Sequence, residues 1–126
     1  MKLGTLMAIA AVIAFVFGLA FTLMPAQTMS MYGITLEEAG QWVGRYLGSA
    51  FIGIAVLNWF ARKAPDGGAL RAIVLGNFVL TLTGLIVAVL NGVSGLGNAL
   101  VWSTVAIYLF LALGFGYFQF AKPAAS

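Results

Sequence analysis

The chain has 126 residues, of which 63% are hydrophobic and 7% are charged, and its mean hydropathy is +1.08. About a quarter of the residues of an ordinary soluble domain are charged, so this composition excludes that class and indicates a membrane protein. The net charge of +3 comes from six basic and three acidic residues, too few for a surface that follows a phosphate backbone, so we expect no nucleic-acid partner.

The first predicted element is an apolar run from residue 3 to residue 24, which Pro25 ends. It is long enough to cross the hydrocarbon layer and longer than the apolar region of a signal peptide. We therefore expect a retained transmembrane helix.

The second predicted element covers residues 36–62. Thr35 and Glu38 have the S/T-x-x-E spacing of a capping box, which predicts a helix start. Gly40, Gly44 and Gly48 follow at intervals of four, so they share one face on which another helix backbone can approach closely. We expect this face to pack against a neighbouring helix.

Arg45 lies within this apolar helix, where an unpartnered guanidinium is costly. Gln41 and Glu38 lie on the same helical face, and Glu37 is next to Glu38. One interpretation is an anchor, in which Arg45 forms an ion pair with Glu37 or Glu38. The other is a ligand or anion site around Arg45.

The third predicted element covers residues 70–91. Asn77, Thr81, Gly84, Ala88 and Asn91 recur at spacings of four and three, so they form one polar and small stripe. Such a stripe faces the bundle interior, where it serves hydrogen bonding between helices or lines a path for a solute. The Asn91–Gly92 pair predicts a turn after this helix.

The fourth predicted element covers residues 96–121. Its end, FQFAKP, resembles WFARKAP at the end of the second element, which suggests two helical hairpins in parallel repeat. The predicted fold is therefore all-α: a polytopic membrane protein with a bundle of four transmembrane helices, in a single domain over residues 1–126.

Basic residues indicate the orientation. Lys2, Arg62, Lys63, Arg71 and Lys122 all fall on one side of such a bundle, and the positive-inside rule makes that side cytoplasmic. We therefore expect both termini in the cytoplasm and the chain in the inner (cytoplasmic) membrane, with Glu37 and Glu38 outside.

Catalytic chemistry is restricted because the chain has no histidine and no cysteine. These are the main ligands of zinc, haem and copper and the usual partners of a nucleophile, so we expect no metal, no cofactor and no enzymatic activity.

The succession of a helix ending at Pro25, a loop ending in Tyr32–Gly33, the run GRYLG at 44–48 and the run WFAR at 59–62 resembles small bacterial four-helix membrane proteins without a settled function. Small multidrug exporters are similar in size, but this first helix lacks their glutamate. Fluoride channels have a threonine- and phenylalanine-rich break that this chain lacks. We expect a helix-packing or interaction subunit of a membrane assembly, in contact with lipid and with further copies or other membrane proteins. The alternative is a homo-oligomeric channel or carrier for a small solute or anion, with Arg45 in its cavity.

Overall fold

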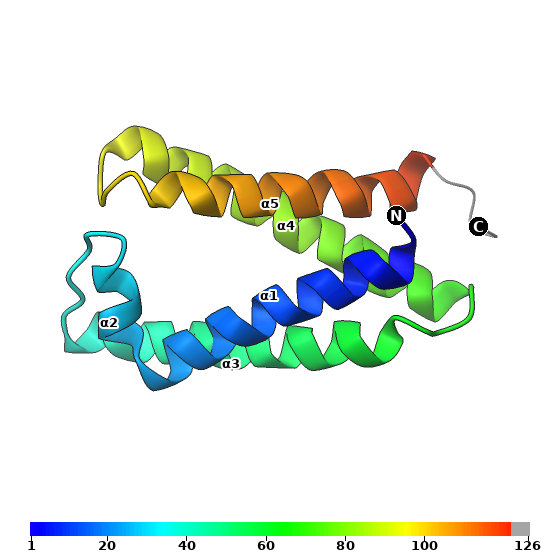
Figure 1. Cartoon of the computed structure of the whole chain (residues 1–126), viewed down its shortest axis with the longest axis horizontal. Helices are drawn as coiled ribbons and strands as arrows, with labels where there is room; N and C mark the ends of the chain where they lie inside the picture. The colour runs from blue at the N-terminus through cyan, green and yellow to red at the C-terminus, as the bar shows by residue number, and fades with distance from the viewer. Residues whose placement is uncertain (122–126) are drawn as a thin grey trace.

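The computed structural model describes residues 1–121, which form helices and contain no strand (Figure 1). The long helices are α1 (Leu3–Leu23), α3 (Glu38–Ala61), α4 (Gly68–Ser94) and α5 (Val101–Gly116), and a π-helical turn, η1 (Tyr117–Ala121), continues α5. A short helix, α2 (Pro25–Ser30), lies between α1 and α3. With η1 included, the described residues contain four helical spans long and apolar enough to cross a membrane, which confirms the predicted all-α membrane fold.

Pro25 ends one helix and begins another. The first helix stops at Leu23, and Pro25 occupies the first turn of α2, where its missing N–H costs nothing. The Thr28 hydroxyl donates to the carbonyl oxygens of Met24 at 2.6 Å and Ala20 at 3.1 Å, which ties α2 back to the end of α1. The sequence predicts a loop for this segment, whereas the structure forms the helix α2 there.

Three predicted helix ends are wrong. The last span begins at Val101 and not at residue 96, because the left-handed glycines Gly95 and Gly97 hold residues 95–100 in a turn. Helix α3 starts at Glu38 with Glu37 as its N-cap and no capping hydrogen bond from a side chain, so Thr35 and Glu38 form no capping box. Helix α4 continues through Asn91 and Gly92 to Ser94, because Gly92 packs against the Trp102 ring of α5 and needs no turn there. The turn comes at Gly95 and Gly97, whose φ angles of 79° and 89° lie in the left-handed region that favours glycine.

The four long helices form two antiparallel hairpins, α1 with α3 and α4 with α5, drawn as the lower and upper pairs in Figure 1. In the first hairpin, Gly18 of α1 meets Gly48 of α3. In the second, Gly84 of α4 lies against the Tyr108 ring of α5. Glycine at these positions removes the side chain that would otherwise keep the helices apart.

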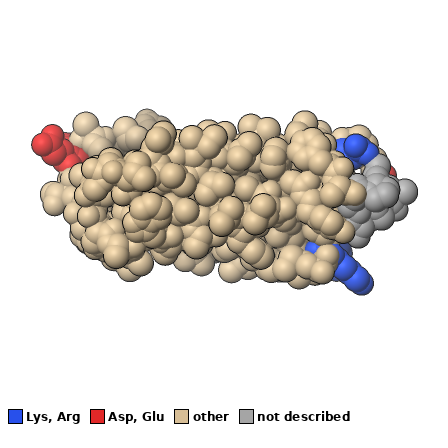
Figure 2. Space-filling view, turned by 90° about the horizontal axis from the view of Figure 1, so that it is seen from above, with Lys and Arg blue, Asp and Glu red and all other residues tan. Residues whose placement is uncertain are grey.

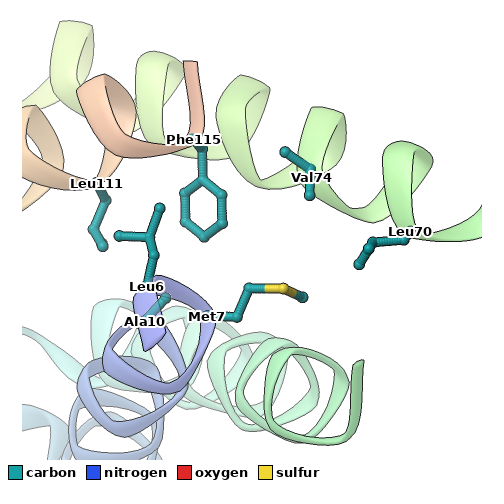
Figure 3. Close-up of a cluster of buried hydrophobic side chains, with 7 residues drawn as sticks. All are labelled: Leu6, Met7, Ala10, Leu70, Val74, Leu111 and Phe115. Atoms are coloured by element: carbon teal, nitrogen blue, oxygen red, sulfur yellow. The ribbon is translucent and has the colours of Figure 1, made fainter. Parts of the chain in front are cut away.

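The two hairpins are joined at both ends by different means. At one end an apolar cluster unites the start of α1, the start of α4 and the end of α5 (Figure 3); its members are Leu6, Met7, Ala10, Leu70, Val74, Leu111 and Phe115. At the other end the backbone N–H of Asn98 donates to the Tyr32 carbonyl at 2.7 Å, and its side-chain amide donates to the Met31 carbonyl at 3.1 Å.

Most of the charged side chains lie at the two ends of the molecule, with Asp66 beside the basic residues and Arg45 within α3. Figure 2 shows a cluster of acidic side chains at one end, lysine and arginine side chains at the opposite end, and an uncharged band between them on this face. An uncharged band flanked by charged ends matches a bilayer with its hydrocarbon layer in the middle. Lys122, one of the five basic residues that predict the orientation, lies outside the described residues.

Candidate functional site

A buried pair of asparagines connects the two hairpins through their side chains. Asn58 of α3 is 0% exposed and Asn77 of α4 is 6% exposed. Each side-chain amide donates to the carbonyl oxygen of the other, at 3.0 Å from Asn58 and 2.8 Å from Asn77. The polar contact between α3 and α4 is therefore a reciprocal hydrogen-bonded ring.

All four N–H donors of this pair are used. The second donor of Asn58 goes to the Ile54 carbonyl, and that of Asn77 goes to the Ile73 carbonyl, both at 3.0 Å. A side-chain amide has two N–H donors, so no donor is left for a solute. The pair is built as a structural connection.

Thr81, one turn further along α4, is 2% exposed. Its hydroxyl donates to the carbonyls of Asn77 at 2.7 Å and Phe78 at 3.2 Å, so it too is satisfied within the helix. Ala88 is also buried, while Gly84 and Asn91 are half-buried. Asn91 lies far along α4 from Asn77, and its backbone carbonyl accepts a hydrogen bond from the Ser94 hydroxyl at 2.6 Å.

The three glycines of α3 have different surroundings. A Cβ on Gly48 would lie 2.6 Å from the Thr22 nitrogen and 2.7 Å from the Gly18 carbonyl oxygen, so the backbones of α1 and α3 touch there. A Cβ on Gly44 would lie 3.2 Å from the Pro25 side chain, whereas one on Gly40 would meet only Leu36 of the preceding segment. The close helix approach therefore involves Gly44 and Gly48, and not Gly40.

Arg45 is half-buried, and its guanidinium carbon lies 4.7 Å from the centre of the Trp42 ring. This is a cation–π contact within one turn of α3. Among residues 1–121, neither Glu37 nor Glu38 forms an ion pair with it, and both acids are exposed. Gln41 donates to the Leu36 carbonyl at 3.3 Å. The structure thus does not join Arg45, Gln41 and the two acids into the network considered for the anchor.

Arg45 is also remote from the polar interior. Thirteen residues of α3 separate it from Asn58, which at 1.5 Å per residue is roughly 20 Å along the helix axis. Thirteen residues at about 100° each also place the two positions roughly 140° apart around the helix axis, so Arg45 and Asn58 lie on different sides of α3. Arg45 and the Asn77–Thr81 stripe are two separate places.

An open groove of about 330 Å³ runs between α3 and α4 on the outside of the asparagine pair. Its wall is apolar except for Asn77, and Gly76 has no neighbouring atom within 4 Å of where a Cβ would be. The lining residues are Ile54, Leu57, Ala72, Ile73, Gly76, Asn77 and Leu80. Neither Arg45 nor Thr81 lines it.

Asn58 and Asn98 were not among the site residues predicted from the sequence. Asn58 is a single amide in the apolar run from Phe51 to Phe60, and an amide in hydrocarbon needs a partner. That signal points to a second buried amide, which Asn77 supplies. Asn98 carried no comparable signal, because a polar residue beside Gly97 is ordinary in a turn.

Comparisons with protein-family models, with curated proteins and with solved structures found no match to this chain.

Proposed function

We propose that this chain is a non-enzymatic integral membrane protein that acts as an interaction subunit of a membrane assembly, through the outward surface of α3. That surface consists of Trp42, Tyr46, Ser49 and Gly53, which recur at spacings of four, three and four and are all exposed. We call it the α3 face. It is the observation that carries the proposal.

The composition of the α3 face differs from that of a lipid-facing surface. Helix α3 has a mean hydropathy of 1.2, the lowest of the four spans, against 2.6 for α1 and 2.4 for α4. Ser49 and Gly53 have small-xxx-small spacing, and a Cβ on Gly53 would meet no atom within 4 Å. Small residues at this spacing allow a second helix to pack closely, whereas they offer little side-chain surface for contact with lipid.

The hydrogen bonding of the buried side chains between α3 and α4 also supports an interaction role. The donors of Asn58 and Asn77 and the hydroxyl of Thr81 are all satisfied within the chain. A solute path needs polar groups that are free to replace water around the solute. The lack of histidine and cysteine supports a role without catalysis or bound metal.

The test is the mass of the purified protein in mild detergent. We expect the wild type to purify as an oligomer or with another membrane protein, and Gly53→Leu to release single chains of 13.2 kDa. Gly76→Leu is the matched control, because Gly76 is also an open, exposed helix glycine but lies in the groove and not on the α3 face. A wild type that is monomeric and without a partner would contradict the proposal.

We further propose that the chain lies in the cytoplasmic membrane with the basic end, which carries Lys2, Arg62, Lys63 and Arg71, inside. The positive-inside rule is the basis for this orientation. The chain has no cysteine, so single cysteines at Glu37 and Lys63 report each end cleanly. A membrane-impermeant thiol reagent should label the first and not the second in intact cells. The reverse pattern would overturn the orientation.

The alternative function is a homo-oligomeric channel or carrier for an anion at Arg45. One observation favours it: no carboxylate among the described residues forms an ion pair with the Arg45 guanidinium, so its charge is available to an anion. If it is correct, small anions should raise the melting temperature of the wild type and not that of Arg45→Gln. Equal melting temperatures with and without anions would remove this alternative.

A further inference from the structure

We propose that the groove between α3 and α4 binds one acyl chain of an anionic glycerophospholipid, whose headgroup lies beside the basic loop that connects these helices. This site is separate from the α3 face and does not depend on the proposed function. Three observations support it: the size and lining of the groove, the basic residues near one end of it, and the loose packing between the two hairpins.

The size and lining of the groove fit a hydrocarbon chain. Its volume is about 330 Å³. A methylene group needs about the same space as a water molecule, about 30 Å³, so roughly ten groups fit. The groove is open along its length, so a flexible chain can lie in it without passing through an enclosed cavity. The wall offers no free N–H donor, since both donors of Asn77 are used.

One end of the groove lies near the basic end of the molecule. The groove is lined by the last third of α3 and the first half of α4, and residues 62–67 connect the two helices directly above it. Lys63 and Arg71 are exposed there, and Arg62 stacks on the Trp59 ring at 3.8 Å. Asp66 is the one carboxylate of this loop. A phosphate at this level meets a net positive charge, which favours an anionic headgroup.

The groove also lies where α3 and α4 pack loosely against each other. The two hairpins share little contact along α3 and α4 apart from the asparagine pair, and a Cβ on Gly76 would meet no atom within 4 Å. A chain in the groove would fill this gap and bridge the hairpins. We therefore expect a bound lipid to stabilise the fold and to remain with the protein through purification.

The experiment compares phosphatidylglycerol with phosphatidylcholine as the added lipid. Native mass spectrometry of the wild type should show one retained phosphatidylglycerol, and this lipid should raise the melting temperature by about 4 °C or more over phosphatidylcholine. Gly76→Leu fills the groove and should lose both effects, as should Ala72→Leu, which serves if the first variant does not fold. Gly53→Leu adds the same side chain outside the groove and should keep both.

The headgroup part of the site has its own variant. Lys63→Gln combined with Arg71→Gln should abolish the preference for phosphatidylglycerol while a lipid is still retained. Lys2→Gln, which removes a charge from α1, is the control. An unchanged preference in the double variant would refute the role of the basic loop.

Three outcomes would overturn the proposal: no lipid on the wild type, equal stabilisation by both lipids, or full lipid retention by Gly76→Leu and Ala72→Leu. If Gly76→Leu instead breaks an oligomer and leaves the lipid in place, the groove belongs to an interface between copies. The proposed function fails differently, because it predicts loss of assembly in Gly53→Leu without loss of lipid.

Discussion

The hydrogen-bonded ring between Asn58 and Asn77 makes the sharpest stability prediction. Replacing either residue by leucine, which has a similar volume, removes both bonds between the side chains, at 3.0 and 2.8 Å. Hydrogen bonds between helices in membrane proteins average about 0.6 kcal/mol each, with a maximum of about 1.7 kcal/mol. The two bonds together therefore contribute about 1.2 kcal/mol, and at most about 3.4 kcal/mol.

The remaining asparagine limits the loss. In Asn58→Leu, Asn77 keeps its bond to the Ile73 carbonyl but has one buried donor and its carbonyl oxygen without a partner. Leaving a buried polar group unpaired costs about 1–3 kcal/mol. We therefore expect each single variant to be destabilised by about 1–3 kcal/mol. The double variant has no stranded amide, so it should be less destabilised than the sum of the single variants by about 1 kcal/mol or more.

The assay is reversible unfolding in mixed micelles, with the wild type, both single variants and the double variant measured under one condition. Asn98→Leu, which changes an asparagine at the opposite end, is the control and should be additive with Asn58→Leu. Coupling between Asn58 and Asn77 below about 0.3 kcal/mol would refute the reasoning, since that is within the error expected for independent sites.

Three further predictions follow from individual contacts. Gly48→Leu should cost about 1–3 kcal/mol or more, because its Cβ meets the rigid backbone of α1, whereas Gly40→Leu meets a flexible leucine and should be tolerated. Thermal unfolding in detergent distinguishes them, and equal stability would refute the assignment. Arg45→Gln should cost about 0.5–1 kcal/mol and show coupling to Trp42→Leu. Coupling to Glu37→Gln instead would restore the ion-pair interpretation. Asn98→Ala should cost about 1 kcal/mol and speed proteolysis of the loop at 95–100, and unchanged cleavage would show that the contact between the loops contributes nothing.

The lengths and membrane character of the long helices could be predicted because they depend on local composition. Each apolar run is long enough to span hydrocarbon by itself, and every backbone group must be satisfied within the helix, whatever its neighbours are. The packing role of Gly44 and Gly48 could also be predicted, since their spacing alone puts them on one face of the helix.

Helix ends were less predictable. A turn at Asn91–Gly92 is a good local choice, but the contact of Gly92 with the Trp102 ring, ten residues away, keeps this glycine inside the helix. Thr35 and Glu38 also have the local spacing of a capping box, but the structure forms no capping hydrogen bond there. At Gly92, packing against another helix therefore outweighed the local turn preference.

The sequence by itself determined that this chain is a membrane protein of four apolar helices with basic and acidic ends, because those properties follow from the solvent that each segment must enter. Only the tertiary structure decided which polar residues meet. It paired Asn77 with Asn58 and left Arg45 beside Trp42, because hydrogen bonds between helices depend on rotation and depth, and side-chain spacing along one helix does not determine the register of the next.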